Sequence, residues 1–101
     1  MLTPVHARMA RAALRWTLVD LQGKTGISKN TLLRFETGKG IHHNTAIKIE
    51  AAFHQEGVFF TYEGDERGHT VGLSKELARR LALAFNRTPK PKSSKRRAKV
   101  K

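Results

Sequence analysis

The sequence contains no cysteine, few aromatic residues and no long apolar run. Without cysteine it can form neither a disulfide nor a thiolate zinc site, so a reducing compartment suits it. No apolar run approaches the roughly 18 residues that a membrane-spanning helix requires. The first 16 residues mix arginine and histidine with apolar residues and have no signal-peptide core. We therefore expect a soluble, cytoplasmic protein that does not enter a membrane.

Acidic residues are also scarce, and the charge is unevenly distributed. The 101 residues include 20 Lys and Arg against 8 Asp and Glu, a formal net charge of +12. Residues 1–73 hold nine basic and seven acidic residues, whereas residues 74–101 hold eleven basic residues and one acidic residue. Such a basic segment suits a polyanion, because Lys and Arg release the counterions condensed on nucleic acid. The alternative is a solvated tail that only keeps the protein in solution.

Capping residues and apolar spacing predict four helices before residue 58. A helix is expected over about residues 4–15, and three more follow caps at Thr17, Ser28 and Asn44 and end near glycines 26, 38 and 57. In the first helix, apolar residues recur at helical spacing. They are Val5, Met9, Ala12, Ala13 and Trp16.

The pattern changes after residue 57. Two runs rich in β-branched and aromatic residues, 58–62 and 70–73, predict a hairpin with a loop over 63–69. Residues 74–86 return to helical spacing, and their apolar stripe is expected to pack on its own domain or on a second copy of the chain. That stripe consists of Leu77, Leu81, Ala84 and Phe85. From residue 88 onward two prolines, seven basic residues and no apolar pattern predict a segment that is disordered when free.

The most informative segment is residues 16–39. It reads as two short helices joined by a tight turn, Thr25-Gly26-Ile27. Gly26 permits the left-handed backbone of the turn, and Ile27 fills the angle between the helices. The second helix of such a pair can enter the major groove of DNA, which is wide enough for one helix.

This segment resembles the lambda-repressor/Cro-like (XRE) family of helix-turn-helix regulators. The matching positions are Leu14, Trp16, Thr17, Asp20, Leu21, Gly26, Ile27, Ser28, Thr31, Arg34, Phe35, Glu36, Gly38 and Lys39. Residues 3–4, 10–12 and 56–60 also look like small bacterial members of the family. The resemblance covers about residues 3–73 and implies a mainly α fold: a four-helix lambda-repressor-like DNA-binding domain, followed by a small β-hairpin and a C-terminal helix. We divide the chain accordingly into a helix-turn-helix domain with its hairpin (1–73), a C-terminal helix (74–87) and a basic tail (88–101).

The resemblance makes residues 28–36 the recognition helix. It places Lys29, Asn30 and Arg34 where the family reads base edges. The residue types agree with this, because Arg and Lys suit guanine and Asn suits adenine. The resemblance implies phosphate contacts at Thr17, Ser28, Thr37 and Lys39, and His43 and Asn44 are further candidates. It also implies an ion pair between Arg11 and Glu36 that joins the first helix to the third.

Four positions depart from the family pattern. Leu18 stands where the family commonly has a glutamine that grips the DNA backbone. Gln22 and Gly23 stand where small or helix-favouring residues are usual, and Gly23 should weaken the second helix by about 0.5–1 kcal/mol. Leu33 is an apolar residue on an outward face, which suits half-buried packing, a thymine methyl group or a protein partner. These departures favour a second hypothesis, a helix-turn-helix protein-interaction module (an antiactivator or antitoxin) that binds a regulator or a toxin.

The sequence offers no chemistry for a metal, a cofactor or catalysis. Only His42 and His43 lie close together, and adjacent histidines do not converge on one ion without further ligands. Ser28 has no histidine partner, and no glycine-rich loop follows a strand to cradle phosphate. We therefore expect no enzyme but a sequence-specific transcriptional regulator, a repressor, that binds double-stranded DNA in the nucleoid. A homodimer and a protein partner both remain open at this point.

Overall fold

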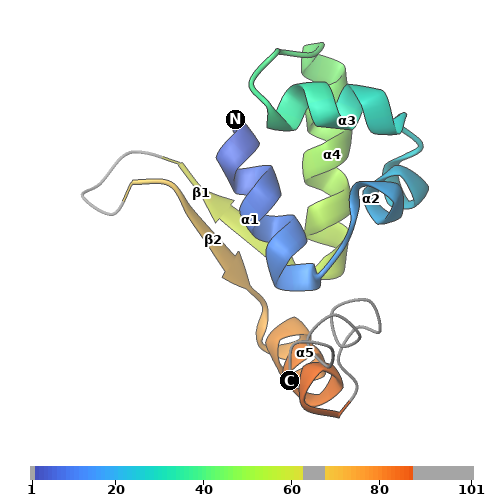
Figure 1. Ribbon diagram of the computed structural model, residues 1–101. Helices are drawn as coiled ribbons and strands as arrows, with labels where there is room; N and C mark the ends of the chain where they lie inside the picture. The colour runs from blue at the N-terminus through green and yellow to red at the C-terminus, as the bar shows by residue number, and fades with distance from the viewer. Residues whose placement is uncertain (1, 63–67, 88–101) are drawn as a thin grey trace, which may run out of the picture.

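Four helices form the N-terminal part of the molecule: α1 (Pro4–Leu14), α2 (Leu18–Thr25), α3 (Lys29–Glu36) and α4 (His43–Glu56). The computed structural model describes residues 2–62 and 68–87. An antiparallel hairpin follows, β1 (Val58–Thr61) and β2 (Thr70–Leu73), and α5 (Lys75–Arg87) comes last (Figure 1). The predicted mainly helical fold with a small two-stranded sheet is confirmed. The predicted tail, residues 88–101, and most of the predicted hairpin loop lie outside the described residues.

The helix starts follow from capping chemistry, with one exception. Thr3, Thr17 and Ser28 cap α1, α2 and α3 by accepting a hydrogen bond from a backbone N–H three residues later. The predicted cap at Asn44 is wrong. Helix α4 starts at His43, its N-cap is His42 in an extended conformation, and no side chain caps it. Asn44 is already the second residue of the helix, so it lacks the extended backbone that a capping residue needs.

The buried face of α1 is not the one that its apolar spacing marks. The residues of α1 that are buried are His6, Ala7, Ala10 and Leu14. Val5 and Met9, which have the apolar spacing, are instead 47% and 38% exposed. Apolar spacing alone does not mark the buried face, because that face includes a polar side chain, His6. The helix also ends one residue earlier than predicted, at Leu14, because Arg15 takes a left-handed conformation with φ of 58°.

The core lies where the four helices and the hairpin meet. Its largest fully buried apolar side chains come from five different elements, and they are Leu21, Leu32, Ile49, Phe53, Val58 and Leu77. Leu77 brings the first turn of α5 into this core, whereas Leu81 is half-buried and Leu83 is 54% exposed. Among the described side chains of α5, Leu77 is buried in the core and Leu81 packs against it, and Figure 1 shows the helix at the opposite end of the molecule from α3.

Gly57 is the point at which α4, the hairpin and α5 meet. Its φ is +104°, a conformation that favours glycine. A Cβ atom at this position would lie 2.7 Å from Ser74 Oγ and 3.2 Å from Leu77 Cβ. Its carbonyl accepts a hydrogen bond of 2.8 Å from the N–H of Ser74. The absence of a side chain at Gly57 thus allows α5 to start directly against the end of α4.

Gly23 is the opposite case, because it lies inside helix α2 and faces solvent. A Cβ atom there would meet nothing within 4 Å. We expect Gly23→Ala to raise the free energy of unfolding by about 0.5–1 kcal/mol, since alanine loses less backbone entropy in a helix. Urea denaturation of the two full-length proteins, followed by the fluorescence of the single tryptophan, measures the difference. Gly57→Ala serves as the control that must destabilise, and a loss of stability in Gly23→Ala would contradict the expectation.

Candidate nucleic-acid interface

The outward face of α3 carries the three residues for which base contacts were predicted. Lys29, Asn30 and Arg34 are all exposed, and Leu33, which is 47% exposed, lies among them. At about 100° per residue, these four side chains fall within an arc of about 140° on the helix. The opposite side of α3 is buried, with Leu32, Phe35 and Glu36 turned to the core.

The three polar side chains of this face are available for a ligand. Within the described residues, Lys29, Asn30 and Arg34 make no side-chain hydrogen bond or ion pair. The first N–H of the helix, that of Lys29, is taken by the side-chain oxygen of Gln22 at 2.9 Å. Gln22 therefore ties α2 to the start of α3, a role that the sequence analysis missed.

The single carboxylate of α3 is neutralised on the inner side of the helix. Two nitrogens of Arg11, Nε and Nη2, donate to Glu36 Oε2 and Oε1, each at 2.7 Å. A third, Nη1, donates to the Trp16 carbonyl at 2.9 Å, and Arg8 donates to the backbone carbonyl of Glu36 at 2.7 Å. Only 4% of the Glu36 side chain is exposed. The outward face of α3 consequently carries cations and an amide but no negative charge.

The same contacts hold Arg11 in its charged form. The hydrogen bonds to Glu36 raise the pKa of the Arg11 guanidinium, burial lowers it, and the Coulomb attraction of Glu36 raises it further, so the net direction is upward. A planar guanidinium that meets a carboxylate with two parallel bonds is the strongest common form of ion pair in proteins. The pair thus joins α1 to α3 firmly and fixes the position of α3 on the body of the protein.

The hydroxyl groups for which phosphate contacts were predicted are mostly engaged within the chain. The Thr37 hydroxyl donates to the carbonyls of Leu33 and Arg34, at 2.9 and 3.1 Å, and its N–H donates to the Leu33 carbonyl. Ser28 Oγ donates to Thr31 Oγ1 at 3.0 Å. Thr37 therefore has no donor left for a phosphate in this conformation, and Ser28 has no hydroxyl proton left for one.

Two other predicted phosphate residues keep a donor. Thr17 accepts from the Asp20 N–H with its hydroxyl oxygen, which leaves the hydroxyl proton to donate. The ammonium group of Lys39 is exposed and makes no side-chain contact within the described residues. These two groups lie at the start of α2 and just beyond the end of α3.

The start of α4 leaves backbone donors open next to α3. His43 and Asn44 are exposed, and within the described residues their N–H groups have no partner, because the helix has no side-chain cap. Uncapped N–H groups and the helix dipole make such an end favourable for an anion. Arg34 and His42 line one shallow hollow together with Thr31 and Thr45, so the structure brings this end beside α3. His42 was not among the predicted contacts.

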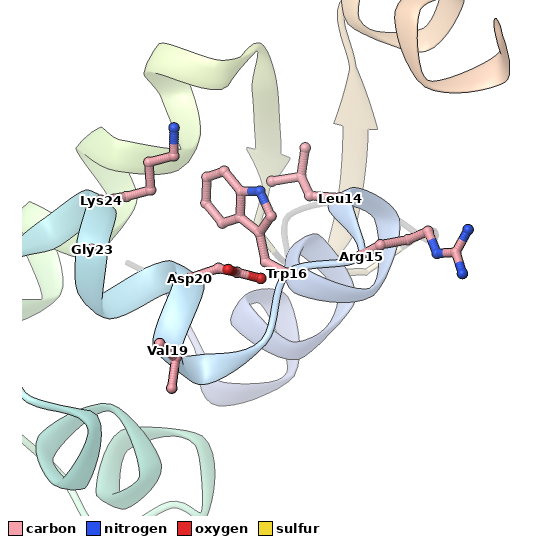
Figure 2. A pocket seen from close by; sticks show the side chains of 7 residues that line it. All are labelled: Leu14, Arg15, Trp16, Val19, Asp20, Gly23 and Lys24. Atoms are coloured by element: carbon pink, nitrogen blue, oxygen red, sulfur yellow. The ribbon is translucent and has the colours of Figure 1, made fainter. Parts of the chain in front are cut away.

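A second hollow lies beside α2, and none of the predicted DNA-contact residues lines it. Figure 2 shows its lining side chains, which come from the end of α1, from the connection that follows it and from α2. Trp16 stacks on Phe53, with ring centroids 5.8 Å apart, and Lys24 Nζ lies 5.5 Å from the centre of the Trp16 ring. Lys24 also pairs with Glu56 at 3.5 Å. Two of its lining residues, Trp16 and Lys24, thus pack on α4.

Other kinds of site find little support in the described residues. Over residues 2–62 and 68–87, no three His, Cys, Asp or Glu side chains come together as a metal site would require. In the same part of the chain, every helix is too short or too polar to cross a bilayer. No family model matches the sequence, and no curated protein is similar to it.

Proposed function

We propose that this chain is a sequence-specific, double-stranded DNA-binding transcriptional regulator, a repressor, whose helix α3 enters the major groove. The observation that carries the proposal is the outward face of α3. Lys29, Asn30 and Arg34 are exposed and unpartnered within the described residues, while the acidic group of the same helix is buried against Arg11. A helix with this face meets both needs of groove binding, since it presents base-reading donors and does not repel phosphate.

The arrangement around α3 supports the same proposal. The turn between α2 and α3 has Gly26 in a left-handed conformation, with φ of 78°, and Ile27 packed against the core. We propose that α1–α4 form the lambda-repressor-like domain that the sequence resembles, with α2 and α3 as its helix-turn-helix. The open start of α4 and Lys39 then lie on the side of α3 where a DNA backbone would pass.

Selection of binding sites from random duplex DNA with the purified full-length chain tests the proposal. Recovery of a common sequence motif is the expected result. Recovery of random sequence would contradict it, because a basic protein binds any duplex through phosphates alone. The selection is run at about 150 mM salt, where non-specific phosphate binding is weakened.

Arg34→Ala is the variant that tests base reading directly. Arginine with two bonds to one guanine contributes about 1–3 kcal/mol of discrimination, so the variant should lose that much on the selected site. The preference at one base position should relax, while binding to random duplex changes much less. Arg79→Ala provides the matched control, since Arg79 is an exposed arginine on α5, far from α3. An equal loss on selected and random duplexes would show that Arg34 contacts a phosphate instead.

A second candidate function is the protein-interaction module. The exposed Leu33 is the observation that favours it, because apolar side chains on an outward helix face also suit protein partners. Under this reading, α3 binds a regulator or a toxin. The same selection separates the two functions, since a protein-interaction module would recover no motif.

A further inference from the structure

Leu33 lies within the outward face of α3, not at its edge. Around the axis of α3, Lys29 and Arg34 mark the two ends of the exposed arc, and Leu33 and Asn30 lie between them. Leu33 is 47% exposed, and the core on the other side of α3 is filled by Leu32 and Phe35. The side chain therefore projects in the same general direction as the three polar residues.

The chemistry of the major groove restricts what such a leucine can face. Base edges in the groove present hydrogen-bond donors and acceptors, and the 5-methyl group of thymine is their single apolar feature. A leucine pressed against a donor or an acceptor would remove water from that group and give no bond in return, which is unfavourable. If α3 lies in the groove, the base beneath Leu33 is favoured to be thymine.

We infer that Leu33 is a specificity-determining residue that selects thymine by contact with its 5-methyl group; this inference rests on the proposed function. Leu33 and Asn30 are one helical turn apart, and residues so spaced have Cβ atoms about 5–6 Å from each other. Asn30 suits adenine, and successive base pairs are about 3.4 Å apart. The selected thymine therefore lies within about two base pairs of the adenine read by Asn30.

Replacement of thymine by deoxyuridine in the selected duplex tests the contact, because the two bases differ only in that methyl group. Each thymine of the selected site is replaced singly, and affinities are measured by titration with the full-length chain. We expect one of these replacements to weaken binding about fourfold, the effect of burying one methyl group. Leu33→Ala should bind the thymine and deoxyuridine duplexes within about 1.5-fold of each other.

Leu83→Ala is the matched control, since Leu83 is a leucine of similar exposure, 54%, on α5 at the other end of the molecule. It should keep the fourfold discrimination. If the chain selects a motif but ignores every deoxyuridine, or if Leu33→Ala keeps the discrimination, the thymine contact is wrong and the proposed function stands. If no motif is selected, both fail, and Leu33 then belongs to a protein-binding face.

Discussion

Replacement of Arg11 by methionine should lower the free energy of unfolding by about 3 kcal/mol at neutral pH. The variant keeps much of the side-chain volume but removes the guanidinium that neutralises Glu36. The buried carboxylate then loses its ion-pair partner, since Arg8 bonds only to the backbone carbonyl of Glu36, and the bond from Arg11 to the Trp16 carbonyl is lost as well. We place the loss at the lower end of the range for buried ion pairs because the Arg11 side chain is itself 22% exposed, so water can reach the site. Urea denaturation followed by tryptophan fluorescence measures it.

A double-mutant cycle separates the ion pair from packing. Arg11→Met combined with Glu36→Leu should be more stable than Arg11→Met alone, because the second change removes the unpaired buried charge. Lys24→Met is a control for an exposed pair, since Lys24 is 51% exposed and sits 3.5 Å from Glu56; it should cost well under 1 kcal/mol. If Arg11→Met lowers the free energy of unfolding by less than about 1 kcal/mol, the Arg11–Glu36 pair behaves like the exposed Lys24–Glu56 pair.

His6→Ala should destabilise the fold by about 3 kcal/mol, through a cavity and lost hydrogen bonds together. His6 is fully buried, with its ring edge-on to Phe60 and Tyr62 at centroid distances of 5.3 and 4.9 Å. Its Nδ1 accepts from the Thr3 N–H at 3.3 Å, and its Nε2 lies 2.9 Å from the Thr61 carbonyl. A carbonyl only accepts, so Nε2 carries the ring proton, and the neutral imidazole joins the start of α1 to the end of β1.

Two amide substitutions divide this effect between the two ring nitrogens. Asparagine at position 6 can replace Nδ1 as the acceptor for Thr3, whereas glutamine can replace Nε2 as the donor to Thr61. Each should recover part of the stability lost in His6→Ala. His43→Ala changes an exposed histidine and should stay within about 0.5 kcal/mol of the parent chain. If His6→Ala unfolds at the same urea concentration as His43→Ala, the ring does not hold the hairpin to α1.

The starts of α1, α2 and α3 and the outward face of α3 could be predicted because they depend on local chemistry. Thr17 and Ser28 cap the helices that follow them. The helical spacing of apolar residues along α3 places Leu32 and Phe35 on one side and Lys29 and Arg34 on the other. The Arg11–Glu36 contact, in contrast, was expected from family resemblance alone, since no local rule connects residues 25 positions apart.

What the sequence could not reveal are polar groups whose partners are distant or belong to the backbone. His6 breaks the apolar spacing of α1, and its burial depends on a carbonyl 55 residues away. The Thr37 hydroxyl bonds to carbonyls of the last turn of α3, and its predicted phosphate contact stays a prediction. Arg15 ends α1 in a left-handed conformation that glycine would have signalled, and no glycine stands there.

The two contrasting glycines have a consequence for how chains related to this one should differ from each other. Gly57 is constrained by the fold, since any side chain there would meet Ser74 and Leu77 and would also have to adopt a positive φ. Gly23 is constrained by nothing within the described residues. Over evolutionary time, substitution at Gly57 should be purged wherever α5 follows the hairpin, while Gly23 should drift readily to alanine and gain stability. If related chains nevertheless keep glycine at position 23, the reason is contact of that surface with a partner and not the stability of the fold.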